Sequence, residues 1–224
     1  MISRSVLLRR ALPLGVLSLI LAIPASVGAI DPDNLNSIGF RNRTGTDIYY
    51  LYLSPGDSEF WGTDILGAAS VLEDGDALEF FIHYPDPCNE FDIMAVGGLD
   101  DAYIVTNFEI CDGSPASVQF TSDDAVSSPP EFELMQLDLT NDTGFEIWYL
   151  FVSPQDSNMW GVDQMDSETT LDQGETISLL VNATDILYDV HAVDVDGDTY
   201  TFQVDLGEQV GYELSADIEF DYID

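Results

Sequence analysis

The feature that most constrains this chain is a phrase that occurs twice. "YLYLSPGDSEFWGTDIL" at residues 50–66 returns as "YLFVSPQDSNMWGVDQM" at residues 149–165. The match runs without a gap, at an offset of 99 residues, from an Asn-x-Thr-Gly turn at Asn42 or Asn141 through the apolar run that follows each Trp-Gly. A match of this length indicates one folding unit copied in tandem, and it is too long for a pair of isolated active-site motifs.

The duplication divides the chain into two repeats. We expect repeat 1 over residues 30–120 and repeat 2 over residues 134–224, each the size of a small domain. Between them, residues 121–133, "TSDDAVSSPPEFE", combine Ser, Asp and paired prolines, which indicates a linker.

The repeats are predicted to be all-β. Segments such as "DIYYLYL", "EIWYLFV" and "TYTFQVD" are short and rich in β-branched and aromatic residues, and turn signals such as "NDTG", "EDGD" and "DVDGD" separate them. Six or seven strands per repeat favour two tandem β-sandwich (immunoglobulin-like) domains. The segment after each Trp-Gly could hold a short helical turn. The strand after each Thr-Gly is apolar on both faces, which favours a central position in its sheet.

The N-terminus has the order of a secretory signal peptide. Arg4, Arg9 and Arg10 precede the apolar run "ALPLGVLSLILAIPA", and small residues follow it. This order predicts cleavage near Ala29, so that residues 1–29 are removed and the protein is exported to the periplasm, the cell envelope or the medium.

The charge is extreme and one-sided. The net charge is −37, and cleavage would remove three of the five cations, which leaves about −40 and only Arg41 and Arg43. Such a surface repels nucleic acid and anionic membranes, so both are excluded as partners. The chain is nevertheless 46% hydrophobic and 11% aromatic, which favours a folded protein adapted to salt or divalent cations over a disordered one.

The two cysteines, Cys88 and Cys111, both lie in repeat 1. Their counterparts in repeat 2 fall near Asp185 and Glu208, so both cysteines are missing there together. Joint absence is what a disulfide predicts, and export provides an oxidising compartment. A metal-binding or catalytic cysteine pair is the alternative.

The shared pattern N-x-T-G, SP-x-x-S-x-x-WG-x-D, L-x-x-G and D-x-DG covers most of residues 40–214. It resembles a family of small secreted bacterial proteins built from one or two such β-repeats. The family has no established activity, so the resemblance implies a repeat fold and assigns no catalytic residues.

Two hypotheses concern the repeated Ser-Pro to Trp-Gly segment. In the first, the segment is a structural turn in which the Trp packs back on the sheet and Gly releases the chain. In the second, Trp61 and Trp160 are exposed platforms for a sugar or peptide, with Asp57 and Asp156 beside them as acceptors. Exposure of the two indoles separates these hypotheses.

A calcium site is the next candidate. "VDVDGDTY" places Asp194, Asp196 and Asp198 at alternate positions, and carboxylate oxygens suit Ca²⁺. The spacing departs from an EF-hand, because Thr199 and Asp205 stand where that loop needs Gly and Glu. A hairpin turn with an Asp-Gly tip is the alternative.

Signals for catalysis are sparse. The two histidines, His83 and His191, do not occupy equivalent positions in the repeats, and we expect His191 to be packed within a strand. The sequence favours a binding, adhesion or envelope-associated module without catalytic activity, with a glycan or a protein surface as partner. The alternatives are a calcium-dependent carbohydrate-binding protein and a secreted hydrolase, which would need a cleft between the repeats where a histidine or paired acids meet.

Overall fold

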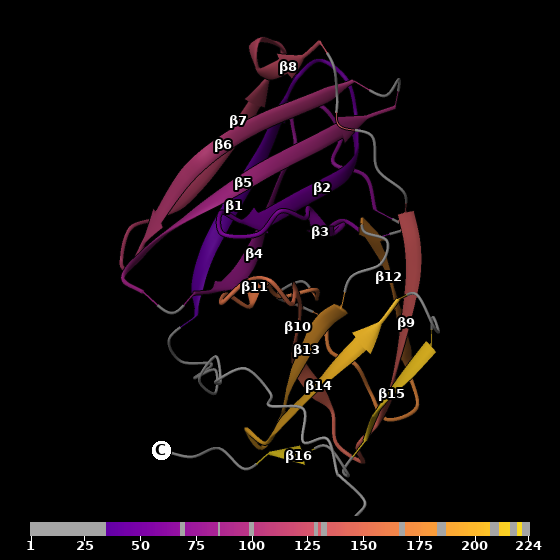
Figure 1. The fold of residues 1–224 in the computed structure, drawn as a ribbon. Coiled ribbons are helices and arrows are strands. Elements are labelled where there is room, and N and C mark those ends of the chain that lie inside the picture. The colour runs from indigo at the N-terminus through magenta and orange to yellow at the C-terminus, as the bar shows by residue number, and fades with distance from the viewer. Residues whose placement is uncertain are drawn as a thin grey trace, which may run out of the picture.

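The described part of the chain falls into two lobes (Figure 1). The computed structural model describes residues 35–67, 70–84, 86–98, 101–127, 130, 134–165, 169–182, 187–206, 211–215 and 219–220. The predicted signal peptide, residues 1–29, lies outside these ranges. Within them, no helix has the length and the apolar character that crossing a membrane requires.

The strands of the first half follow the alternation and turn signals of the sequence. They are β1 (Asn36–Arg43), β2 (Ile48–Pro55), β3 (Gly62–Thr63), β4 (Ala77–His83), β5 (Cys88–Gly97), β6 (Ala102–Cys111), β7 (Ala116–Thr121) and β8 (Ala125–Val126), with one turn of 3₁₀-helix at Ser122–Asp124 between the last two.

The second half repeats the same order of elements. Its strands are β9 (Leu134–Asp142), β10 (Ile147–Pro154), β11 (Gly161–Val162), β12 (Thr176–Asn182), β13 (Leu187–Asp194), β14 (Thr199–Asp205), β15 (Gly211–Ser215) and β16 (Glu219–Phe220).

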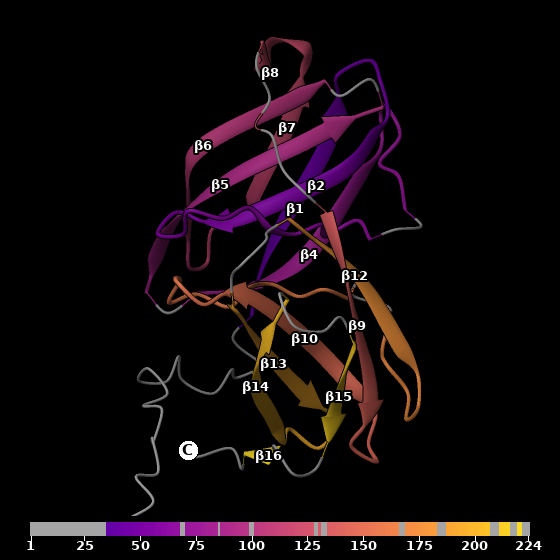
Figure 2. The same ribbon diagram turned by 45° about the vertical axis from the view of Figure 1, so that its right-hand side comes forward.

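Each half is built around two four-stranded sheets. In the first sandwich, the sheet β2-β5-β6-β8 faces the sheet β11-β4-β1-β7; in the second, β10-β13-β14-β16 faces β15-β9-β12-β3 (Figures 1 and 2). All pairs are antiparallel except β1 with β7 and β9 with β15. The prediction of an all-β sandwich fold is confirmed.

The two sandwiches exchange strands. The short strand after Trp61, β3, pairs with β12 of the second sandwich, and the equivalent strand after Trp160, β11, pairs with β4 of the first. A further backbone bond extends each crossing, from the N–H of Asp64 to a β12 carbonyl at 2.8 Å and from that of Asp163 to a β4 carbonyl at 3.0 Å. One sheet of each sandwich is therefore completed by a strand from the other half of the chain.

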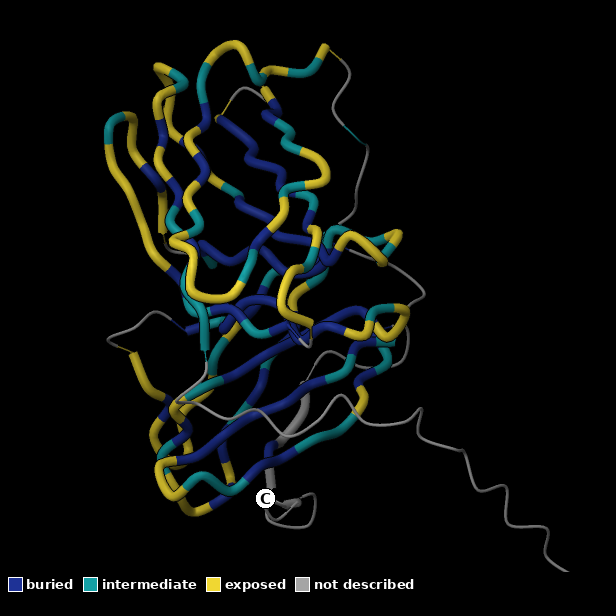
Figure 3. Tube along the Cα trace, turned by 90° about the vertical axis from the view of Figure 1, so that its left-hand side faces the viewer, coloured by how far each residue is buried: buried dark blue, intermediate teal, exposed yellow. Residues whose placement is uncertain are grey.

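The hydrophobic cores are shared in the same way. Met159 and Val162 of the second half belong to the core of the first sandwich, which otherwise contains its own inward residues such as Ile38 and Phe40. Phe60 of the first half packs against the core of the second sandwich. Figure 3 shows buried segments continuing through the middle of the molecule, where the two lobes meet.

The turn that opens β2 and β10 explains one shared phrase. The buried Asn42 side chain donates to the carbonyls of Thr46 and Leu72, at 2.7 and 2.9 Å, and accepts the Thr44 N–H at 3.0 Å. Asn141 makes the equivalent bonds in the second half. The Asn-x-Thr-Gly phrase is thus a turn closed by its own asparagine.

Three details differ from the sequence predictions. No helical turn forms in the described residues after each Trp-Gly, because a short strand and a bridge take their place. β2 and β10 lie at sheet edges, and they are apolar on both faces because their outer faces are covered by the Trp loops. Residues 121–126, predicted as linker, end β7 and pair β8 with β6, so they belong to the first sandwich.

The predicted disulfide is present. Cys88 and Cys111 pair opposite each other on β5 and β6, 23 residues apart, with a bond between their sulfurs.

This disulfide should contribute measurably to stability. For a closed loop of this length, the loss of chain entropy in the unfolded state contributes about 3 kcal/mol to the free energy of unfolding. We therefore expect Cys88→Ser/Cys111→Ser to lower the free energy of unfolding by about that amount in urea. Reducing agent should lower the stability of the wild type to the same level and leave the variant unchanged; an unchanged wild type would contradict this.

Candidate functional site

The repeated Ser-Pro loops, residues 54–62 and 153–161, lie against each other where the sandwiches meet. One carboxylate oxygen of Asp156 accepts the Ser58 hydroxyl at 2.8 Å, and the other accepts the next backbone N–H at 3.0 Å. Asp57 does the same with Ser157 at 2.8 Å and with the N–H after it at 3.2 Å. The two candidate ligand acceptors, Asp57 and Asp156, are therefore engaged in holding the halves together.

These reciprocal hydrogen bonds should contribute to the free energy of unfolding. Hydrogen bonds to a charged acceptor contribute about 1.5–3 kcal/mol, but these lie at the exposed rim, where solvent competes. We expect Asp57→Ala and Asp156→Ala each to cost about 1 kcal/mol in urea unfolding. Asp74→Ala on the far turn, whose carboxylate accepts the Gly45 N–H within one sandwich, is the control for a bond that does not cross the interface. Ligand-like roles for the two aspartates would instead leave stability unchanged.

The tryptophans of these loops are not exposed platforms. Trp160 is 5% exposed and packs with Phe151 and Val193 on the outer face of the second sandwich. Trp61 is half-buried and packs with Tyr52 and neighbouring residues of the first sandwich. The platform prediction is wrong for Trp160, because the exchanged strand places its indole between the sandwiches. The structural hypothesis accounts for both loops.

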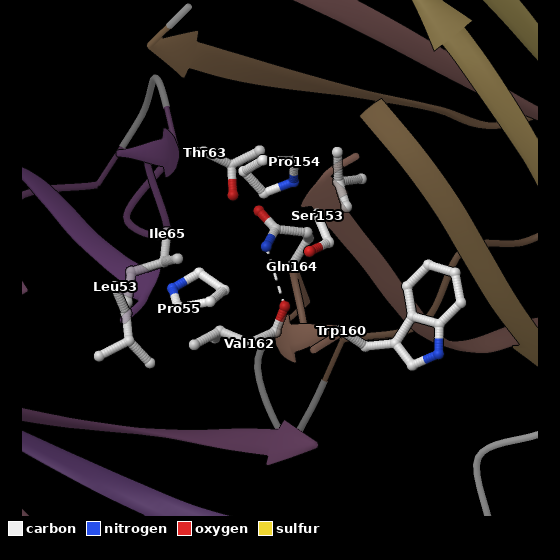
Figure 4. Close-up of a pocket in the computed structure, with 12 residues that line it drawn as sticks. Leu53, Pro55, Thr63, Ile65, Ser153, Pro154, Trp160, Val162 and Gln164 are labelled. Carbon is white, nitrogen blue, oxygen red and sulfur yellow. Dashed lines mark hydrogen bonds between the residues drawn. The ribbon is translucent and has the colours of Figure 1, made fainter. Parts of the chain in front are cut away.

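No ligand-sized cleft opens at the crossing of the loops. The cavity there, lined by residues of both halves such as Leu53, Pro55, Pro154 and Gln164, has a volume of about 10 Å³ (Figure 4). That is room for roughly one water molecule. The cleft that a hydrolase would need is not found at this crossing.

Both histidines of the chain meet at this interface. His83 ends β4 of the first sandwich and pairs with Gly161 of β11. His191 lies on β13, stacks on Trp160 with ring centroids 4.8 Å apart and bonds the Thr201 hydroxyl through Nδ1 at 2.7 Å. Both imidazoles contact the Phe151 ring, each with centroids 6.5 Å apart. The packed position predicted for His191 agrees with its 3% exposure.

Burial makes both imidazoles hard to protonate. Among the described residues, His83 Nδ1 and His191 Nε2 are buried without a hydrogen-bond partner. Desolvation lowers the pKa of His83 to about 4. Desolvation, with a smaller contribution from His83, lowers the pKa of His191 to about 3. Both are therefore neutral near pH 7 and are packing residues.

The candidate calcium loop is a hairpin turn. The buried Asp194 carboxylate accepts the N–H groups of Asp196 at 2.9 Å and Asp198 at 3.0 Å on one oxygen, and the Tyr200 hydroxyl at 2.8 Å on the other. Asp196 is exposed and Asp198 is half-buried. Asp194, Asp196 and Asp198 do not form a cluster of carboxylates that could hold a metal ion, so the structure does not bring the predicted calcium ligands together. The turn hypothesis explains the phrase.

The described ranges contain one cluster of side chains with metal-ligand atoms, namely Cys88, Cys111 and Glu109. The two sulfurs of that cluster are bonded to each other, so their thiolates are not free for a metal.

Two exposed aromatic residues in the described part of the chain lie elsewhere, at a bulge that both halves share. The pairing of β2 with β5 slips by one residue between Ile48 and Tyr50, and the pairing of β10 with β13 slips at the equivalent point. The extra residue is Tyr49 in one half and Trp148 in the other, and each is 43% exposed. Sequence reasoning missed both. The available signal was a large aromatic residue at the same position of both repeats, since Tyr49 and Trp148 lie 99 residues apart, but the bulge that turns them outward leaves no mark in the sequence pattern.

The surroundings of Trp148 combine apolar and acidic groups. Phe145 and Val195 are also exposed, at 43% and 40%, and the Val195 N–H bonds the Glu146 carbonyl at 3.0 Å, which holds the two turns together. A Glu146 carboxylate oxygen accepts the hydroxyl of Thr170. Thr170 also lines a hollow of about 370 Å³ on the surface of the second sandwich. We define this region, Phe145, Glu146, Trp148, Thr170 and Val195, as the Trp148 face.

Comparison with known proteins gives no match: no protein family, no curated protein and no solved structure is similar to the chain at a significant level. The function therefore has to be inferred from the chain's own residues.

Proposed function

We propose that the protein is an exported, non-catalytic binding module of the cell envelope or its surroundings. The observation that carries this proposal is the shared bulge that turns Tyr49 and Trp148 outward. Bulges re-aim side chains and are frequent beside functional sites. Here each interrupts a strand that is otherwise buried, and it exposes one large aromatic ring at the same position of each half.

The rest of the molecule supports a rigid carrier for these two rings. The exchanged strands and shared cores join the sandwiches, so the two aromatic positions move as one body. The Ser-Pro loops, the Asp194 turn and the histidines are explained by packing and turn geometry. Among the described residues, the Trp148 face and its counterpart around Tyr49 are the aromatic surfaces that this packing does not explain.

Retention on envelope material tests this function. The mature protein and its Tyr49→Ala/Trp148→Ala variant are mixed with purified envelope fragments of the producing organism, and the pelleted fraction is measured. We expect the double change to lower retention at least fivefold, since aromatic anchors dominate binding. Leu78→Ala, on a residue of β4 that is 39% exposed, is the matched control and should behave as wild type. Equal retention of all three proteins, or none at all, would contradict the proposal.

A further inference from the structure

We propose that the Trp148 face binds a cationic peptide segment of a partner protein, with an arginine guanidinium or lysine ammonium stacked on the indole. This inference rests on the proposed binding function and names the chemistry of its ligand. It follows from three features of the face: an exposed ring, one sign of charge around it, and an unequal counterpart in the other half.

The ring is suited to a cation. Trp148 is 43% exposed and stands at a bulge, so a large part of its side chain is accessible to a ligand. An indole is the best aromatic partner for a cation, and guanidinium groups also stack flat on it. The neighbouring Phe145 and Val195 offer apolar surface to the aliphatic stem of a long basic side chain.

The charge around the ring has one sign. Residues 134–224 contain no lysine and no arginine. The turns that border Trp148 carry Asp142, Glu146 and Asp196, and Asp142 and Asp196 are exposed. Asp142 accepts the Gln173 amide at 2.8 Å, and Glu146 accepts the Thr170 hydroxyl, which leaves each carboxylate a further acceptor position. A ligand that places a cation here meets acceptors and no competing cation of the protein.

The counterpart in the first sandwich is less suited. Tyr49 packs closely against Gly98, where an added Cβ atom would lie 2.8 Å from the Cε2 atom of the ring, so part of the phenol is in contact with the backbone there. The first half also carries the two cations of the mature chain, Arg41 and Arg43, on β1. Tyr49 is thus the equivalent position in the other half. Its phenol is a weaker partner for a cation than an indole, and its half of the protein carries both acidic and basic residues.

Calorimetric titration with a hexa-arginine amide peptide tests the inference. The full mature chain is titrated in roughly 1 M NaCl, where the Debye length is about 3 Å and attraction to the general acidic surface is screened. We expect Trp148→Ala to weaken binding roughly five- to thirtyfold, the range of a partly desolvated cation–π contact. Trp148→Phe should retain most of the affinity, Glu146→Gln should lose part of it, and Tyr49→Ala should stay within about twofold of wild type.

Two outcomes would overturn the inference. Binding of the peptide that is unchanged by Trp148→Ala would mean that only the acidic surface attracts it. A neutral ligand of similar length, hexa-glutamine or cellohexaose, that binds in a Trp148-dependent way while hexa-arginine does not would assign the face to an uncharged ligand. In that second case the proposed binding function would stand, since envelope retention would still depend on Trp148. Loss of that retention effect would remove both.

Discussion

Acidification from pH 7 to pH 4 is expected to destabilise the wild type by several kcal/mol more than a variant that lacks both histidines. In the unfolded chain an imidazole has a pKa of about 6.5. In the folded protein burial lowers the pKa of His83 to about 4 and that of His191 to about 3. Between these values the unfolded state binds protons that the folded state excludes. The stabilisation is therefore complete above pH 6.5 and is lost as the pH falls towards 4 and then 3.

The chain supplies its own replacement residues. In the first sandwich, Met94 and Ile104 occupy the paired positions that His191 and Thr201 have in the second. Asn182, which pairs with Gly62, likewise corresponds to His83. The variant His83→Asn/His191→Met/Thr201→Ile therefore gives each position the residue found at the equivalent position of the other half. It also removes the Thr201 hydroxyl, which would otherwise lose its bond to His191.

Measurement of urea unfolding at half-unit pH steps checks this prediction. Each unit of pKa shift corresponds to about 1.4 kcal/mol, so the difference between the two slopes is large. Asp163, whose backbone N–H bonds the carbonyl of Phe81 on β4, and Asp189, two residues before His191, are common to both proteins. Asp64 is also present in both proteins. Burial raises its pKa to about 7, so the folded protein takes up a proton at Asp64 on acidification, and this stabilises the fold as the pH falls. Parallel slopes for wild type and variant would show that carboxylates alone govern the acid response.

Trp160→Ala is expected to cost about 3–5 kcal/mol, the usual cost of truncating a buried tryptophan. The indole is 5% exposed, stacks on His191 and fills the space between the sandwiches. Its removal opens a cavity where β11 passes to the first sandwich, so the change should also weaken the pairing of β11 with β4.

Trp61→Ala is the matched control, because Trp61 has the same place in the other loop but is only half-buried. We expect it to cost about half as much or less, since less apolar surface returns to water. Urea unfolding of both variants decides the point. If both variants lower the free energy of unfolding by the same small amount, the packing role of Trp160 is contradicted. Both indoles would then again be candidates for ligand contact.

Much of the fold was predictable because it is governed by local pattern. β-branched and aromatic runs bounded by Asx-Gly turns fixed the strands, and the joint absence of two cysteines from one repeat predicted the bond between Cys88 and Cys111. The glycine after each tryptophan was expected to release the chain, and Gly62 and Gly161 both have a positive φ, which glycine adopts readily.

The candidate site was predicted less well, for a physical reason. The loop phrase of residues 54–62 matches that of residues 153–161 because each loop binds the other, and a linear pattern does not reveal which copy a segment pairs with. Asp57 and Trp160 are residue types that are common in ligand sites, but in the structure both are engaged where the two sandwiches meet. Trp148 was missed because a bulge changes the alternation by one residue, which composition does not record.

The strand exchange sets an order of events for folding. β4 ends at His83, and the strand that completes its edge begins at Gly161, almost eighty residues later in synthesis. Until then the first sheet has an open edge, of the kind that favours pairing with foreign strands. Neither half can reach its final form alone, so the chain should fold late and in one cooperative step. A truncated, duplicated or recombined form of the chain would then fold only when it keeps both halves, since each supplies the strand that completes a sheet of the other.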